Sequence, residues 1–142
     1  MADTFSKTIS CSLRDLEQLL LEASAFLEGK VSTKAEYATA ISLEEMITNT
    51  IKYGYDNPAG HQIGIRIELK EATVGLTLTD DAREFNPLLA AKPDITKPVD
   101  DREIGGLGIF LVRGLVNTMN YSRLDGRNIL EIEVKRNGDT IS

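Results

Sequence analysis

Two side chains, Glu45 and Asn49, have types and a spacing that could support proton and metal chemistry. They lie in the segment 41–54, where one stripe recurs at steps of three and four residues, as on a helix face: Leu43, Ile47, Thr50, Ile51 and Gly54. Glu45 and Asn49 are one turn apart on a different face, so their oxygens point the same way. A carboxylate can accept a proton, and an amide oxygen can hold a hard cation. A solvated polar face is the competing interpretation.

A third candidate, Asp80, follows a strand pattern. Val74, Leu76 and Leu78 alternate with more polar residues, and continuing by twos places Asp80 on the same, buried face. A carboxylate in that position costs desolvation energy unless it has a partner. The alternative is that the strand ends at Thr79 and Asp80 begins a turn. If Asp80 is buried, it can accept a hydrogen bond from an amine such as that of adenine.

The segment 86–103 loses all periodicity and carries three prolines among many charges. A loop of this length inside a domain is typically a lid, a binding loop or a disordered segment. It leads into Gly105, Gly106, Leu107 and Gly108, which precede a helical pattern. Glycines at a helix start leave backbone amides free and allow a phosphate to approach closely. The three features together fit a nucleotide with Mg²⁺ at its phosphates.

Other nucleotide and metal motifs are absent from the sequence. There is no G-x-x-x-x-G-K-[ST] segment, and Gly106-x-Gly108 lacks the third glycine of the dinucleotide fingerprint. His61 has no histidine or cysteine neighbours at ligand spacing, so we expect a surface residue at the start of a strand.

Composition points to an ordinary soluble domain. The 142 residues are 42% hydrophobic and 27% charged, with a net charge of -6, which disfavours a nucleic-acid backbone as partner. No apolar run approaches the roughly 20 residues of a membrane span. The single cysteine, Cys11, excludes an internal disulfide and suits a reducing, cytoplasmic location with a core-filling role.

The periodicities predict one domain over 1–142, with about three helices and five mostly antiparallel strands. Helix-cap patterns begin at Ser12 with Asp15 and at Thr33 with Glu36, while Gly29 and Gly54 end these helices. The third helix carries Ile109, Val112, Val116 and Met119 on one side. Strands are expected at 4–12, 63–69, 74–80, 121–124 and 129–135, with a hairpin turn at Asp125-Gly126.

Three segments resemble the ATP-site boxes of the GHKL superfamily. They are Glu45-x-x-x-Asn49, Asp80-x-Ala82-x-x-Phe85-Asn86-Pro87 and the run from Gly105 to Val112. Their wording is most similar to the bacterial anti-sigma factor serine/threonine kinases. The resemblance implies a Bergerat-type two-layer α/β (α+β) sandwich, with a mixed, mostly antiparallel sheet covered on one face by about three helices. ATP or ADP and Mg²⁺ would be its ligands.

The resemblance also implies residue roles. Asn49 would contact Mg²⁺, and Glu45 would be the base; its neighbour Glu44 lies about 100° around the helix from it. Asp80 would bind the adenine amine, while Gly105, Gly106, Leu107 and Gly108 would contact phosphate beneath a lid at 86–104. Lys52 either reaches phosphate or is solvated. Ala82 stands where the family usually has glycine, which could weaken nucleotide binding.

Function and partners follow from the same resemblance. The first expectation is a protein kinase that phosphorylates a STAS-type antagonist and also sequesters a sigma factor, as a homodimer using the N-terminal strand edge. The second, motivated by Ala82, is a weakly catalytic or non-catalytic nucleotide-dependent switch that binds proteins. The third is a histidine-kinase ATPase module acting in trans. Neither nucleic acid nor membrane is an expected partner.

Overall fold

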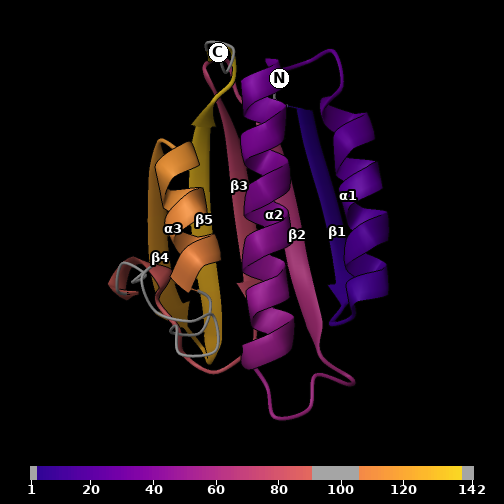
Figure 1. Ribbon diagram of the computed structural model, residues 1–142. Coiled ribbons are helices and arrows are strands. Elements are labelled where there is room, and N and C mark those ends of the chain that lie inside the picture. The colour runs from indigo at the N-terminus through magenta and orange to yellow at the C-terminus, as the bar shows by residue number, and fades with distance from the viewer. Residues whose placement is uncertain (1–2, 91–105, 139–142) are drawn as a thin grey trace.

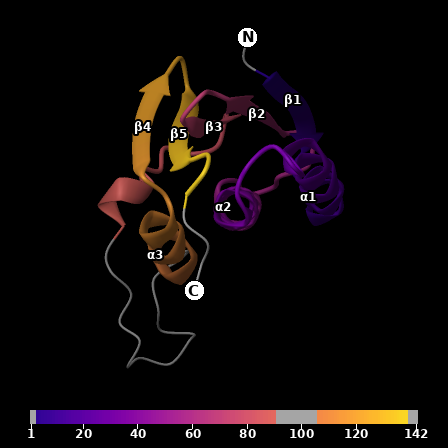
Figure 2. The same ribbon diagram turned by 90° about the horizontal axis from the view of Figure 1, so that it is seen from above.

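A five-stranded antiparallel sheet carries all three α-helices on one face (Figures 1 and 2). The computed structural model describes residues 3–90 and 106–138. The strand order is β1-β2-β3-β5-β4, so β1 and β4 form the two edges. The elements are β1 Asp3–Ser10, α1 Leu13–Leu27, α2 Thr33–Tyr53, β2 Gln62–Leu69, β3 Thr73–Asp80, the 3-10 turn η1 Pro87–Leu89, α3 Gly106–Leu115, β4 Thr118–Leu124 and β5 Arg127–Lys135.

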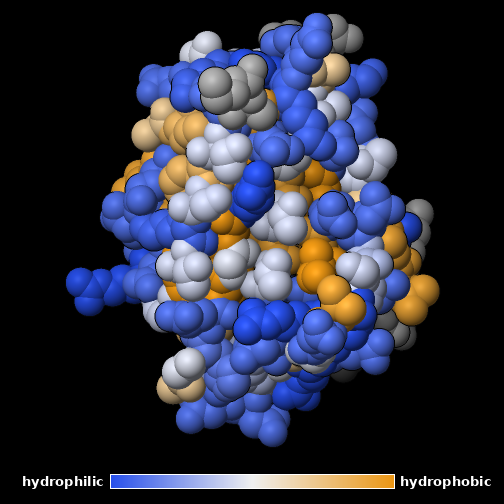
Figure 3. All heavy atoms as spheres, turned by 180° about the vertical axis from the view of Figure 1, so that it is seen from behind, coloured by the Kyte–Doolittle hydropathy of each residue, from blue (hydrophilic) through white to orange (hydrophobic). Residues whose placement is uncertain are grey.

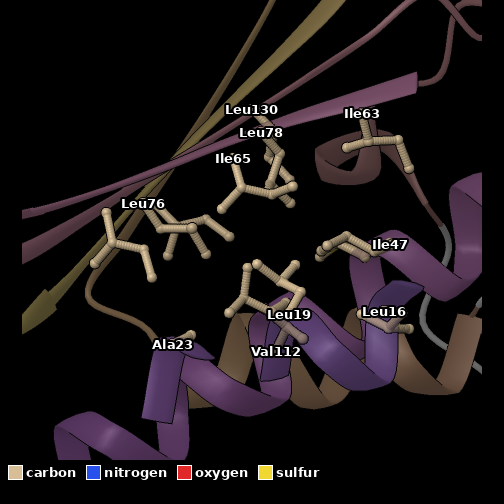
Figure 4. Close-up of a cluster of buried hydrophobic side chains, with 14 of the residues drawn as sticks. Leu16, Leu19, Ala23, Ile47, Ile63, Ile65, Leu76, Leu78, Val112 and Leu130 are labelled. Carbon is tan, nitrogen blue, oxygen red and sulfur yellow. The ribbon is translucent and has the colours of Figure 1, made fainter. Parts of the chain in front are cut away.

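The core lies between the sheet and the helices because each inner strand alternates buried and less buried residues. In Figure 4 the side chains of Ile65 and Leu78 lie on the sheet side of the cluster, and those of Leu19 and Val112 lie on the helix side. Cys11 is also buried, in agreement with the core-filling role predicted for it. The predicted two-layer α/β arrangement is therefore confirmed.

None of the helices in the described part of the chain covers the other sheet face, whose surface is predominantly polar or small (Figure 3). Every strand pair in the described chain is antiparallel, so the described sheet contains no parallel pair.

Two predicted helix boundaries need correction. Helix α2 is capped by Ser32, whose side chain accepts from the amide of Ala35, so the cap lies one residue before the predicted Thr33. Helix α3 ends at Leu115, and Met119 belongs to β4 opposite Ile132. The helix stops because Asn117 pairs with β5 through both its backbone and its side chain, which removes it from the helical hydrogen-bond ladder.

The predicted cap at Ser12 and the predicted turn at Asp125-Gly126 are both present. Ser12 caps α1 by accepting from the amide of Asp15, and this role ends β1 at Ser10, short of the predicted residue 12. Asp125 and Gly126 both have positive φ, 52° and 77°, as a two-residue type I′ hairpin turn requires. This turn fixes the register of β5 against β4, and β5 in turn pairs with β3.

Two leucines on α1 provide a test of the core. Leu19 is fully buried, whereas Leu21 is 68% exposed on the same helix. Leu19→Ala should lower the free energy of unfolding by about 2–5 kcal/mol, because it leaves a cavity under the sheet. Leu21→Ala should change it by less than about 0.5 kcal/mol. Urea titration followed by circular dichroism measures both, and equal losses would contradict this packing.

Candidate functional site

A cavity opens between the C-terminal half of α2 and the sheet. Figure 1 shows the end of α2 and the end of β3 at the lower end of the molecule. It holds about 740 Å³ of empty space, part of it open to solvent. Residues from α2, β2, β3, β4 and β5 line it, as does the segment that follows β3. Its lining is mainly apolar, with a few polar groups, which is typical of a small-molecule site.

Asp80 forms the polar end of this cavity. It is the last residue of β3, paired with Ile63 on β2 and Asn128 on β5, and only 8% of its surface is exposed. The strand therefore continues through Asp80, and the alternative that it begins a turn is wrong. Burial raises the pKa of the Asp80 carboxyl, while hydrogen bonds from Asn128 and the amide of Ala82 oppose this rise.

Ala82 lies next to Asp80 and also lines the cavity. Its backbone amide donates to Asp80 Oδ1 at 3.0 Å, and its φ is not in the left-handed region. The methyl group is buried and faces the end of α2, because a Cβ atom added to Gly54 would lie only 2.8 Å from it. Gly54 thus provides the space that the methyl group needs, and the cavity stays open beside it.

Asn49 faces the same cavity from α2. Its Oδ1 atom is buried and has no hydrogen-bond partner among the residues that the structure describes. An unpaired buried amide oxygen is costly, so its position favours a ligand that completes its coordination. The described residues contain no cluster of three histidine, cysteine or acidic side chains suited to a metal. A single amide oxygen fits Mg²⁺, which takes its other ligands from phosphates and water.

Glu45 lies one turn before Asn49 and is half-buried against α3. A Cβ atom on Gly108 would lie 2.3 Å from Glu45 Oε2 and 3.1 Å from its Cδ. A side chain at this position would displace the end of the Glu45 side chain, so Gly108 leaves room for the carboxylate where it lies. Glu44 is exposed on another face of α2. The first turn of α3 and the carboxylate of Glu45 thus meet one helical turn from Asn49. In the described chain, neither Glu45 nor a residue of α3 is among the residues that line the cavity.

The other predicted ligand residues are placed as follows. Gly106, Leu107 and Gly108 form the first turn of α3. Lys52 is exposed and is not among the cavity-lining residues of the described chain. Gly105 and positions 91–104 of the predicted lid lie outside the described residues. Of the rest of that lid, Asn86 caps the short turn η1.

Sequence reasoning missed a second polar cluster beside Asp80. Tyr55 donates to Asp81 Oδ1 at 2.6 Å, and His61 Nδ1 lies 3.2 Å from both carboxylate oxygens. The rings of Tyr55 and His61 stack at 4.2 Å. These bonds lower the pKa of Asp81, with Tyr55 the larger cause. They also hold Asp81 against the loop between α2 and β2, so that Asp80 alone of the pair faces the cavity.

Asn128 is the other functional candidate that the sequence did not reveal. It is a buried cavity-lining residue on β5, and its Nδ2 atom donates to Asp80 Oδ1 at 2.9 Å. Tyr53, on the last turn of α2, adds an aromatic ring to the lining. The hairpin turn at Asp125-Gly126 could have placed Asn128 opposite Asp80, had the pairing of β5 with β3 been known.

The family model described as the histidine kinase-like ATPase domain matches residues 9–134. The chain belongs to this family, as the resemblance predicted. In the described part of the chain, no helix is long and apolar enough to cross a membrane.

Individual relatives agree with this assignment. The serine/threonine-protein kinase BtrW of Bordetella bronchiseptica is 25% identical over 108 residues, which cover 75% of each chain. The serine-protein kinase RsbW of Halalkalibacterium halodurans is 28% identical over 90 residues, 61% of this chain and 54% of that protein. The chain thus spans about half of the latter relative's length.

A solved structure confirms the fold. The crystal structure of the RsbU and RsbW domains of a Mycobacterium tuberculosis protein superposes with a TM-score of 0.60 at 11% identity. The match covers 99% of this chain and 35% of that one. At this identity the likeness concerns the fold alone.

Asn49 provides the first test of the site. Asn49→Ala removes the unpaired Oδ1, so ADP binding should lose its dependence on Mg²⁺. Asn137→Ala, a change at an exposed asparagine, is the control and should keep that dependence. Calorimetric titration with ADP, with and without Mg²⁺, measures both. An Asn49→Ala protein that still needs Mg²⁺ to the same degree would remove Asn49 from the metal site.

Asp80 provides the second test. Asp80→Asn replaces an acceptor-only carboxylate by an amide that can also donate, so the preference for ADP over IDP, whose base carries a carbonyl, should fall at least about tenfold. Asp81→Asn is the adjacent control and should leave the ratio unchanged, because Asp81 faces away from the cavity. Equal losses of ADP and IDP affinity in Asp80→Asn would argue against base recognition.

Proposed function

We propose that the chain binds Mg-ATP and transfers its terminal phosphoryl group to a serine or threonine hydroxyl of a partner protein. The observation that carries the proposal is the unpaired Oδ1 of Asn49, buried in the same cavity as the Asp80 carboxylate and one turn from Glu45. A nucleotide with its base at Asp80 would direct its phosphates past Asn49 toward α3, which lies against Glu45 one turn earlier on α2. The names of the two kinase relatives support the reaction class.

Each residue has a distinct part in the proposed reaction. Asp80 accepts the exocyclic amine of adenine, and Asn49 holds Mg²⁺, which would neutralise charge on the phosphates. The first turn of α3 offers its free amides to those phosphates. Glu45 accepts the proton of the serine or threonine hydroxyl. The hydroxyl oxygen bonds to the terminal phosphorus of ATP, and the bond between that phosphorus and the oxygen that leaves with ADP breaks.

The proposed partner is a STAS-type antagonist, with a sigma factor as a second partner. This follows from the similarity of the three ATP-site segments to the anti-sigma factor kinases. A homodimer belongs to the same proposal, and β1 supports it as a sheet edge whose outer side has no strand partner among residues 3–90 and 106–138.

The non-catalytic switch was motivated by Ala82. The structure weakens that motive, because the backbone at Ala82 has no left-handed φ and its methyl group packs toward Gly54. No observation on the described residues favours the trans-acting histidine-kinase module over the kinase proposal.

Two adjacent glutamates test the base. Glu45→Gln should leave ADP affinity within about threefold of the unchanged chain and lower phosphoryl transfer by about 100-fold or more, because only the proton acceptor is lost. Glu44→Gln alters an exposed neighbour and should transfer normally. Transfer of radiolabelled phosphate from ATP to STAS-type proteins of the same genome measures this. Full transfer by Glu45→Gln would exclude Glu45 as the base.

A further inference from the structure

The side-chain amide of Asn128 forms hydrogen bonds with several parts of the cavity wall. It lies directly across from Asp80 in the β3–β5 register, at the first buried position of β5. Its Nδ2 donates to Asp80 Oδ1 at 2.9 Å and to the carbonyl oxygen of Arg83 at 3.0 Å. One amide group therefore holds both the buried carboxylate and the segment that follows it.

The other end of the Asn128 amide fixes its orientation. Its Oδ1 accepts from Tyr121 Oη at 2.5 Å and from Arg123 Nη1 at 3.0 Å. A flipped amide would turn its oxygen toward the Asp80 carboxylate and its NH₂ group toward these donors. The contact of the oxygen with the carboxylate and that of the NH₂ group with the Arg123 guanidinium would both be repulsive, so only the observed orientation satisfies the buried groups.

As a result, the two carboxylate oxygens of Asp80 have different surroundings. Oδ1 accepts from Asn128 and from the amide of Ala82, whereas Oδ2 forms no hydrogen bond with any residue that the structure describes. With Oδ1 occupied, the carboxylate cannot rotate without breaking two bonds. Oδ2 is left as a fixed acceptor for a ligand in the cavity.

We propose that Asn128 is a positioning residue that selects the base: it orients Asp80 so that a nucleobase carrying an exocyclic amine is bound and one carrying a carbonyl is rejected. The inference rests on the proposed nucleotide function and deepens it. Asn128 acts here through Asp80. A neighbouring donor also stabilises the carboxylate form, which a buried carboxylate facing an amine requires.

Removal of the amide tests this role. Asn128→Ala should lower the ratio of ADP to IDP affinity by about tenfold or more, because Asp80 is then free to rotate. Asn120→Ala is the matched control, since Asn120 is an exposed asparagine on β4, on the sheet face away from the helices. Calorimetry at fixed Mg²⁺ gives both affinities, and thermal melting checks that each variant is folded.

Asn128→Asp tests the hydrogen bond itself, because a protonated aspartic acid can replace the donor and an ionised one cannot. The groups around the new carboxyl are Asp80 on β3, Tyr121 and Arg123 on β4, and Asp81 and Arg83 after β3. The new carboxyl and that of Asp80 would lie within hydrogen-bonding reach of each other, as Asn128 and Asp80 do, and two such carboxyls share a proton. The ADP affinity of Asn128→Asp, relative to the unchanged chain at each pH, should therefore fall about tenfold or more between about pH 5.5 and pH 9. Asn120→Asp should show no such trend.

The outcomes separate the two proposals. Failure of the unchanged, folded chain to bind ADP would overturn the nucleotide function and this inference with it. Selective ADP binding by the unchanged chain, with an unaltered ADP/IDP ratio in Asn128→Ala and a flat profile in Asn128→Asp, would overturn the inference alone. If Asn128→Ala does not fold, the Asn128→Asp profile decides. A purely structural role would lower affinity for both nucleotides equally and without pH dependence.

Discussion

The buried carboxylate of Asp80 is the constraint on which the site depends. A carboxylate with only 8% of its surface exposed needs hydrogen bonds, and the neighbouring backbone and side chains supply them: β5 brings Asn128 opposite Asp80, and the chain after β3 returns the amide of Ala82. These bonds occupy one carboxylate oxygen and leave the other toward the cavity. The strand register and the hairpin turn before β5 therefore matter for the site, because a one-residue slip of β5 would turn Asn128 to the opposite face of the sheet, away from Asp80.

Helix α2 positions the other candidate site residues along its length. Asn49 opens into the cavity, and Glu45, one turn earlier, lies against α3 where Gly108 leaves room for it. Gly54, at the end of the helix, gives space to Ala82. Two glycines therefore leave room where neighbouring side chains lie closest: Gly108 for Glu45 and Gly54 for Ala82.

The amino-acid pattern was sufficient for the elements and for most candidate residues because each carries a local signal. Alternation placed Asp80 on the buried face, and helical spacing placed Glu45 and Asn49 one turn apart. Asn128 carries no such signal, since its importance comes from pairing between strands 48 residues apart in sequence. The predicted end of α3 was wrong for a similar reason. The apolar spacing continues to Met119, but hydrogen bonds between Asn117 and β5 end the helix earlier. Tertiary contacts decided both cases.

The central claim is that Asn49 and Asp80 line one Mg-nucleotide site. The most direct measurement is calorimetric titration of the purified chain with ADP and ATP, with and without Mg²⁺. We expect Mg²⁺-dependent binding of both nucleotides with a dissociation constant in the micromolar range, about -8 kcal/mol in binding free energy. Absence of binding by a protein shown to be folded would contradict it.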